Sequence, residues 1–334
     1  MIQTDICIVG AGPVGLFAVF EAGLLKMRCH LVDALPQVGG QLSEIYPKKP
    51  IYDIPGFPEI LAGDLVTNLM KQIECFKPTF TLGERVDSFQ KNDDGSMIVT
   101  TSGGTTIHCR ALVIAAGLGC FEPRKPEVKD LEKFEGKGIQ YMVLDPEKFR
   151  DKKVVLAGGG DSALDWANFL APITSELTLV HRSETFRGAP DSAEKVFDLA
   201  QSGKLNLLLN SNVTAVEGND MLENVLLTNN AGEISKVSAD YFIPLFGLTP
   251  KLGPLAEWGL NIDKIAIVVN VEDYSTNIPG VYAIGDINTY PGKLKLILCG
   301  FHEAALMAQS AFRFVYPDQK LSFKYTTVNG VNGF

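Results

Sequence analysis

The chain has 334 residues, 46% of them hydrophobic and 21% charged, and 39 acidic against 30 basic residues give a net charge of −9. This balance is that of a globular protein and excludes a disordered or fibrous chain, while the length predicts two domains. An acidic chain without a block of Lys and Arg is a poor ligand for nucleic acid, because clustered positive charge is needed to neutralise phosphates. We therefore expect no nucleic-acid partner.

The six cysteines include no CxxC pair, and no histidine pair completes a zinc set. We expect neither a metal site nor a disulfide framework. The N-terminus shows no basic region followed by an apolar run, and no apolar stretch approaches the roughly 18 residues that a spanning helix needs. The sequence thus predicts a cytoplasmic protein with no membrane partner.

The first patterned segment has the order strand, glycine turn, helix, strand, acidic residue, which is the order of a dinucleotide-binding unit. We expect these elements at residues 5–9, 10–15, 16–23, 29–32 and 33. The first strand is a continuous apolar run, typical of a strand that is covered on both faces.

Each glycine of this turn has a physical reason. Gly10 is expected to permit the tight turn, Gly12 to let backbone N–H groups reach a pyrophosphate, and Gly15 to let the helix pack close to the strand. The phosphates would then lie at the positive N-terminus of the helix. Asp33 ends the second strand, where a carboxylate accepts hydrogen bonds from ribose hydroxyls, so the site suits FAD or NAD.

The same pattern recurs later in the chain. A strand at 152–157 leads into Gly158-Gly159-Gly160-Asp161-Ser162-Ala163, and a helix and a strand at 177–180 follow. Two such units argue against a purely structural role for the glycine turns.

The second unit has no acidic residue where Asp33 stands in the first. His181 and Arg182 occupy that place, and Arg187 follows. A guanidinium grips a ribose 2′-phosphate that a carboxylate would repel, so this unit is predicted to bind NADP. The alternative is that both arginines are solvated surface charges.

Two prolines make residues 121–126 typical of a linker, and a later apolar strand at 241–247 ends in Thr249-Pro250, which resembles the return linker. They indicate a chain that leaves the first domain, builds a second and returns. After the return, an apolar strand at 281–284 delivers Gly285 and Asp286 to the carboxyl edge of a sheet, where ligands bind in open α/β folds. A helix is expected from about 301 to 314, followed by a tail at 321–334 without helix or strand pattern.

Five motifs stand together in this chain: Gly10-x-Gly12-x-x-Gly15, Gly39-Gly40-Gln41-Leu42, Gly158-x-Gly160-x-x-Ala163, His181-Arg182 with Arg187, and Ala283-Ile284-Gly285-Asp286. In this combination the chain resembles the thioredoxin reductases, flavoproteins with two dinucleotide-binding domains, over essentially its whole length. Those enzymes carry a redox-active CxxC before the second glycine motif. Residues 138–145 contain no cysteine here, so the usual dithiol step is excluded.

Segments 36–47, 52–58 and 158–167 and the extension after the last helix are similar to the thioredoxin-reductase-like type of ferredoxin–NADP reductase. The resemblance implies an α/β fold of two Rossmann-like domains, with parallel sheets, helices and small antiparallel insertions. It implies an FAD-binding domain at 1–120 and 248–334 and an NADP-binding domain at 121–247. It also implies a homodimer in which the tail of one subunit covers the flavin of the other.

Matched positions imply the cofactor contacts. FAD would be held by Gly10, Gly12, Gly15, Asp33, Gln41, Tyr46, Val86, Phe121, Asp286 and Thr327. NADP would be held by Gly158, Gly160, Asp161, Ser162, His181, Arg182 and Arg187. Tyr46 and Tyr325 would stack on the two faces of the flavin. Ser183 replaces an arginine that related second sites often carry.

The activity implied is hydride transfer between NADPH and flavin N5, with single-electron transfer to or from ferredoxin or flavodoxin. No side-chain acid, base or nucleophile is required. Six lysines are candidates for a face that attracts an acidic carrier: Lys48, Lys49, Lys152, Lys153, Lys293 and Lys295. The alternatives are a flavoprotein reductase with another acceptor (oxygen, a quinone, an iron chelate or a disulfide partner) and a flavin-binding regulator without turnover.

Overall fold

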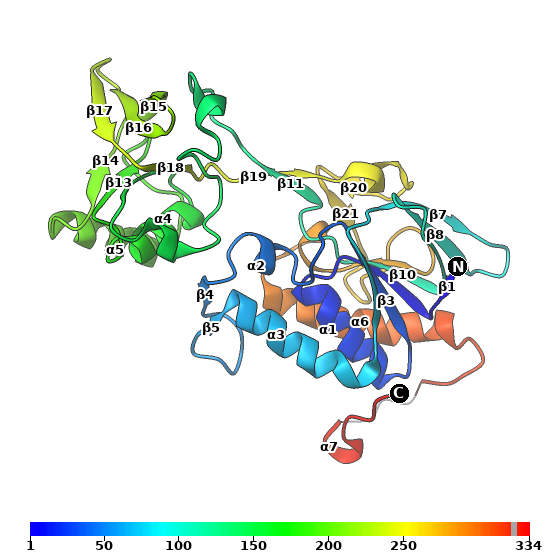
Figure 1. Ribbon diagram of the computed structural model, residues 1–334. Coiled ribbons are helices and arrows are strands. Elements are labelled where there is room, and N and C mark those ends of the chain that lie inside the picture. The colour runs from blue at the N-terminus through cyan, green and yellow to red at the C-terminus, as the bar shows by residue number, and fades with distance from the viewer. Residues whose placement is uncertain (322–325) are drawn as a thin grey trace. The chain divides into compact units, whose positions relative to one another are not determined.

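The computed structural model describes residues 1–321 and 326–334, and it describes the backbone alone at 120–123, 248–250 and 328–329. The described chain forms two compact units, 1–120 with 250–334 and 121–249. Figure 1 shows the elements of both. The two connections contain β11 (Cys120–Pro123) and β19 (Leu248–Lys251), which pair as a two-stranded sheet.

Unit 1 is built on a five-stranded sheet in which all neighbouring strands are parallel. In spatial order the strands are β22 (Val281–Ala283), β10 (Ala111–Ile114), β2 (Ile6–Val9), β3 (Cys29–Asp33) and β6 (Thr79–Leu82). Their side chains form the core, and Ile6, Cys7, Ile8 and all of β10 are buried. This arrangement explains the continuous apolar runs, since both faces of a parallel sheet are covered.

Three helices pack side by side in unit 1, and Figure 1 shows them together: α1 (Pro13–Leu24), α3 (Ala62–Ile73) and α6 (Ile297–Val315). Helix α1 begins three residues before the expected start, because Pro13 occupies the first helical turn, where a missing N–H costs nothing. Helix α6 is one turn longer at its start than expected. Two short helices, α2 (Gln41–Glu44) and α7 (Thr326–Asn329), complete the unit.

Smaller sheets surround this core. One has the order β1 (Ile2–Gln3), β9 (Thr106–Cys109), β8 (Met97–Thr101) and β7 (Val86–Lys91), and another has the order β20 (Ile262–Asp263), β21 (Ala266–Val268) and β23 (Asn288–Thr289). The hairpin of β4 (Pro50–Ile51) and β5 (Ile60–Leu61) is antiparallel. The 3₁₀ turns of this unit are η1 (Glu74–Phe76), η4 (Gly253–Glu257) and η5 (Gly285–Ile287).

Unit 2 repeats the parallel architecture. Its four-stranded sheet has the order β14 (Asn206–Leu208), β13 (Glu176–Val180), β12 (Lys153–Ala157) and β18 (Tyr241–Pro244), all parallel. Helices α4 (Asp161–Leu170) and α5 (Pro190–Gln201) pack against each other. An antiparallel sheet of β15 (Ser211–Gly218), β16 (Leu222–Asn229) and β17 (Ile234–Ser238) and the turns η2 (Leu131–Phe134) and η3 (Pro146–Phe149) complete it. The predicted fold class, two Rossmann-like α/β units with antiparallel insertions, is confirmed.

The end of the tail packs against η1. The Phe334 ring lies 6.2 Å from the Phe76 ring in an edge-to-face arrangement, and the Phe334 N–H donates to the Cys75 carbonyl at 3.1 Å. The Lys26 ammonium donates to the Asn332 carbonyl at 2.7 Å and lies 5.6 Å from the Phe334 ring. An aromatic last residue with two nearby cations thus anchors a segment that has no helix or strand pattern.

Candidate functional site: two glycine cradles

The first glycine turn, with Gly10, Gly12 and Gly15, joins β2 to α1, and we call it the first glycine cradle. A Cβ atom on Gly10 would lie 2.4 Å from the Ala115 carbonyl oxygen, and one on Gly15 would lie 2.1 Å from the Gly10 carbonyl oxygen. Both positions therefore require glycine for packing within the protein. A Cβ on Gly12 would meet no protein atom within 4 Å. Of the three glycines, Gly12 alone faces open space. Such space is what the approach of a ligand's phosphates would require.

Helix α1 begins beside that space. Gly12 is its N-cap residue and no side chain caps the helix, so the first-turn N–H groups keep their hydrogen-bonding capacity and the positive end of the helix dipole is exposed to a ligand. The absence of a Cβ at Gly12 and the uncapped amides together fit a pyrophosphate.

Asp33 lies beside this cradle. One carboxylate oxygen accepts a hydrogen bond from the Ala11 N–H at 2.7 Å and the other accepts from the Leu35 N–H at 2.9 Å. Burial raises the pKa of Asp33, although both backbone donors oppose the shift. A carboxylate has about four lone-pair sites, so Asp33 retains acceptors for ribose hydroxyls.

The segment from Gly39 to Gln41 packs onto the same cradle. The Gly39 N–H donates to the Ala11 carbonyl at 2.8 Å, and a Cβ on Gly40 would lie 3.2 Å from the Gly12 Cα. The Gln41 amide nitrogen lies 3.5 Å from the Cβ position of Gly117, just beyond the end of β10. Gln41 is thus placed at the carboxyl edge of the sheet, where ligands of parallel sheets bind.

Tyr46 and Asp286 also come together at this edge. Burial and the nearby Asp286 carboxylate raise the pKa of Tyr46 to about 12, so its hydroxyl stays protonated at neutral pH. Burial raises the pKa of Asp286 as well, while Lys293 and Lys295 oppose that shift. Tyr46 and Asp286, which are 240 positions apart in the sequence, therefore share one electrostatic environment.

The remaining predicted flavin residues are placed differently. The Val86 side chain is buried in the hydrophobic core at the start of β7, two residues after Glu84, whose N–H donates to the Asp33 carbonyl at 3.1 Å. Thr327 is exposed in α7, which Figure 1 shows well apart from α2, so one chain does not bring Thr327 to Gln41. Tyr325 and the Phe121 side chain lie outside the described residues.

The second glycine turn, Gly158–Ala163, joins β12 to α4, and we call it the second glycine cradle. The His181 ring packs directly against this turn. A Cβ on Gly159 would lie 2.0 Å from the His181 ring, so only glycine permits this contact. The His181 Nε2 lies 3.1 Å from the Thr185 carbonyl and its ring stacks on Phe186 at 5.1 Å. Burial lowers the pKa of His181, and Arg182 and Arg187 add to that shift, while backbone hydrogen bonds oppose it.

Arg182 and Arg187 bring positive charge near this turn. The Arg187 N–H donates to the Gly159 carbonyl at 2.7 Å, and the Arg187 guanidinium lies 3.6 Å from the Cβ position of Gly160. Arg182 and Arg187 are exposed. Gly160 is the N-cap of α4 and no side chain caps that helix, so the Arg187 cation lies beside uncapped amides. This donor set fits a phosphate group.

Asp161 and Ser162 occupy the first turn of α4 and are exposed. One Asp161 carboxylate oxygen accepts from the Ala189 N–H at 2.7 Å, which ties the segment after Arg187 to the glycine turn. The observed contact of Asp161 is thus with the protein's own backbone.

Sequence reasoning missed a buried carboxylate beneath the Gly285–Asp286 turn. Glu303 on α6 accepts hydrogen bonds from the Gly285 N–H, Asn288, Tyr290 and Lys293. A glutamate followed by apolar residues in a helix carries no pattern that distinguishes it from a surface residue. The sequence signal that could have pointed to Glu303 was Lys293, a cation four residues before the start of α6.

Lys293 was expected among the carrier-docking lysines, and that expectation is wrong. Its side chain is 6% exposed and forms an ion pair with Glu303. A buried, paired ammonium presents no charge to a partner. Of the other candidates, Lys48, Lys152, Lys153 and Lys295 are exposed, Lys153 with its ammonium 3.6 Å from the Glu176 carboxylate, and the half-buried Lys49 places its ammonium 5.6 Å from the Tyr46 ring.

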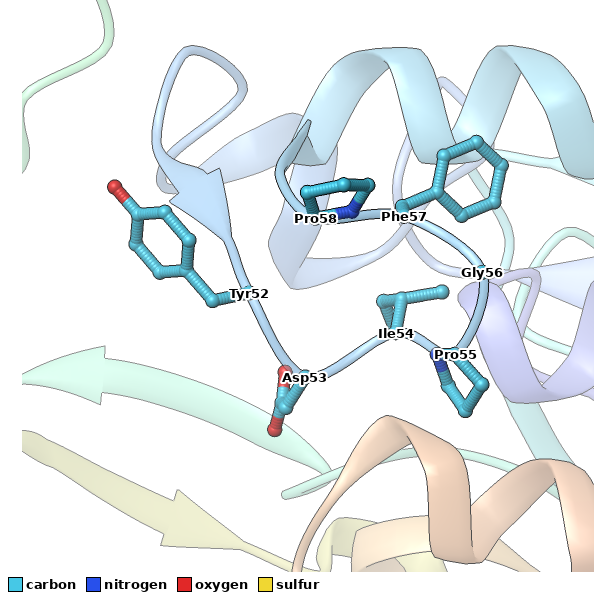
Figure 2. A pocket seen from close by; sticks show the side chains of 7 residues that line it. All are labelled: Tyr52, Asp53, Ile54, Pro55, Gly56, Phe57 and Pro58. Carbon is cyan, nitrogen blue, oxygen red and sulfur yellow. The ribbon is translucent and has the colours of Figure 1, made fainter.

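An open pocket of about 550 Å³ lies in the loop between β4 and β5, and Figure 2 shows its seven lining residues, Tyr52 to Pro58. Ile54 is buried, whereas Tyr52 is 65% and Phe57 41% exposed. This loop is part of the segment 52–58 on which the resemblance partly rests, and it includes none of the predicted cofactor contacts. Across residues 1–321 and 326–334 there is no cluster of metal-ligating side chains and no helix long and apolar enough to cross a membrane.

Comparisons with known proteins agree with this geometry. The model of the pyridine nucleotide-disulphide oxidoreductase family matches residues 4–304. The chain is 63% identical to ferredoxin–NADP reductase 1 of Christiangramia forsetii, over 100% of the chain and 96% of that relative. It is 62% identical to the ferredoxin–NADP reductase of Flavobacterium johnsoniae, over 100% and 95%.

More distant proteins share the fold. A ferredoxin–NADP reductase of Bradyrhizobium diazoefficiens is 50% identical over 98% of the chain and 96% of its own length. The thioredoxin reductase of Lactococcus lactis superposes with a TM-score of 0.80 at 24% identity, covering 94% of this chain and 99% of that one. The chain belongs to the pyridine nucleotide-disulphide oxidoreductase family and, by identity over its full length, to the ferredoxin–NADP reductases within it.

Proposed function

We propose that this protein is an FAD-dependent ferredoxin–NADP⁺ oxidoreductase, in which unit 1 binds FAD and unit 2 binds NADP(H). The observation that carries the proposal is the contrast between the two glycine cradles. The first has a carboxylate, Asp33, beside uncapped helix amides, and the second has two arginines, Arg182 and Arg187, in the corresponding place. The first suits a free ribose hydroxyl and the second a ribose 2′-phosphate.

In unit 1 the α1 amides and Gly12 would bind the FAD pyrophosphate and Asp33 a ribose. Gln41 and Asp286, at the carboxyl edge of the sheet, would hold polar atoms of the flavin end, with the Tyr46 ring beside it. FAD supplies the chemistry that no side chain has: it takes two electrons together as a hydride and passes them on singly. The protein's part is to orient the ring, with the buried Tyr46 side chain beside it.

Three buried thiols of this chain do not support a disulfide acceptor. Cys7, Cys29 and Cys109 are buried, and burial raises the pKa of each. A thiol held protonated in the core is not a nucleophile for disulfide exchange. Together with the absence of cysteine from 138–145, this supports an electron carrier as the acceptor.

Two lysines support a docking face for an acidic carrier such as ferredoxin or flavodoxin. Lys49 lies against the Tyr46 ring, and Lys295 acts electrostatically on Asp286. Local positive charge at the flavin edge attracts an acidic partner even when the net charge of the chain is −9.

The tail belongs to the same proposal. Because Thr327 lies apart from Gln41 within one chain, Thr327 would reach a flavin only in a second subunit, as the resemblance to homodimeric relatives implies. A homodimer is thus part of the proposed function, and a cytoplasmic location stays a prediction.

Steady-state assays with NADPH and a panel of acceptors test the proposal. We expect cytochrome c reduction that depends on added ferredoxin or flavodoxin and exceeds direct reduction of oxygen, quinones, iron chelates and disulfides. A protein that turns over with one of those acceptors and not through a carrier would contradict the assignment. One that binds FAD without consuming NADPH would be a regulator.

A further inference from the structure

Glu303 is a fully buried carboxylate with four donors. Its Oε2 accepts from the Gly285 N–H at 2.7 Å and from the Asn288 amide at 2.8 Å. Its Oε1 accepts from the Tyr290 hydroxyl at 2.9 Å and from the Lys293 ammonium. A carboxylate that is 0% exposed in α6 costs several kcal/mol to desolvate, so a fold retains one only where its partners offset that cost.

Lys293 completes the charge balance of the cluster. Its ammonium is buried against Glu303 and lies 5.3 Å from the Tyr290 ring. The two charges cancel in a place that water does not reach. Removing either one would leave a net buried charge on the flavin side of unit 1.

The cluster fastens the turn that carries Asp286. Gly285 has φ +78°, a backbone conformation that glycine adopts readily, and its N–H points to Glu303. Cβ positions on Gly285 and Gly300 would each meet the Val14 side chain, at 3.4 Å and 2.3 Å. Helix α6, the Gly285 turn and the first turn of α1 are thus packed into one block.

A second link holds the strand that enters the turn. The Asn288 side-chain amide donates to the Ala283 carbonyl at 2.9 Å as well as to Glu303. Asn288 therefore ties the last residue of β22 to the same carboxylate that holds the turn itself. Every direct partner of Glu303 lies in the segment 285–293, which surrounds Asp286 in sequence.

We propose that Glu303 and Lys293 act as a buried positioning pair that fixes the Gly285–Asp286 turn at the FAD site and whose opposite charges balance each other beside it, thereby setting the reduction potential of the bound flavin. The inference rests on the proposed binding of FAD to unit 1. Neither residue is assigned a contact with the cofactor; both act through Asp286 and through the electrostatic potential around it.

Charge replacement tests this pair. Glu303→Gln keeps the size of the side chain and one acceptor but leaves the Lys293 cation unbalanced, which stabilises an anionic reduced flavin. We expect its midpoint potential to be more positive than that of the wild type. Lys293→Met leaves the Glu303 anion unbalanced, and we expect a more negative potential. The double variant removes both charges, so its potential should return close to the wild-type value.

Flavin midpoint potentials of the holoenzymes, measured by dye-coupled titration, give the primary result. FAD dissociation constants, measured by fluorescence, should rise about tenfold or more in each single variant and less in the double variant, as for other buried supporting contacts. Glu74→Gln, an exposed glutamate of the same unit, is the matched control and should change neither quantity.

Potentials of both single variants that equal the wild-type value would overturn the inference, even if their melting temperatures fall. So would a double variant that shifts as far as one of the single variants. If Glu303→Gln does not fold, Lys293→Met carries the same test with the opposite sign. A wild-type protein that binds no FAD would instead refute the proposed function, so the two failures are distinguishable.

Discussion

Replacing Gly12 with alanine separates binding from folding. The Gly12 backbone has φ −73° and ψ −179°, an extended conformation that alanine adopts without strain, and its Cβ would meet no protein atom within 4 Å. We therefore expect the FAD-free Gly12→Ala protein to be as stable as the wild type or more stable by up to about 1 kcal/mol, because alanine restricts the unfolded chain.

FAD binding should respond in the opposite way. The new methyl group would occupy the space through which phosphate oxygens reach the α1 amides. Each hydrogen bond to a charged oxygen contributes about 1.5–3 kcal/mol, so the loss of two weakens binding by roughly 3–6 kcal/mol, or about 10²- to 10⁴-fold. Fluorescence titration with FAD measures the affinity, and urea unfolding of the FAD-free protein measures the stability.

Gly15→Ala is the matched control, since its Cβ would lie 2.1 Å from the Gly10 carbonyl oxygen and something must shift. That variant should lose stability as well as FAD. If Gly12→Ala retains FAD with wild-type affinity, or if it destabilises the FAD-free protein as much as Gly15→Ala does, the assignment of Gly12 to the phosphate path is refuted.

The arginines of the second cradle should determine cofactor choice. Arg182→Ala and Arg187→Ala should each raise the KM for NADPH at least tenfold with little effect on the KM for NADH. Equal effects on the two KM values would assign the arginines to general surface charge. Because the pKa of His181 is lowered in the folded protein, the unfolded chain takes up the His181 proton at a higher pH. The free energy of unfolding should therefore fall as pH drops below about 6.5, and it should fall less steeply in His181→Gln. Urea unfolding at several pH values measures this dependence. Phe334→Ala removes an edge-to-face contact and two cation–π contacts and should cost about 1–2 kcal/mol in unfolding free energy; an unchanged urea midpoint would mean that the tail is not anchored there. Lys49→Ala should raise the KM for ferredoxin at low salt and leave direct NADPH–ferricyanide activity unchanged, and a KM that does not respond would exclude Lys49 from the docking face.

Local sequence patterns predicted the two cradles because their chemistry is local. The turn, the helix start and the acidic or basic residue at the end of the second strand all lie within about 30 positions, and steric rules fix what glycine must do there. The structure bears out the steric reasons for Gly10 and Gly15 in detail.

Contacts between distant segments were not predictable in the same way. The approach of Tyr46 to Asp286, the burial of Lys293 and the four donors of Glu303 depend on how α6 packs against the Gly285 turn. No pattern within one element specifies that packing. The docking of Phe334 on Phe76 has the same origin, because an aromatic residue in a patternless tail carries no information about its partner.

An anaerobic single-turnover experiment tests the central claim most directly. One equivalent of NADPH is added to the FAD-loaded protein, and oxidised ferredoxin follows. We predict that NADPH bleaches the flavin band at about 450 nm and that ferredoxin restores it while two equivalents of ferredoxin become reduced, one electron each. A flavin that NADPH does not bleach, or one that exchanges no electrons with ferredoxin whether ferredoxin is supplied oxidised or reduced, would contradict the account.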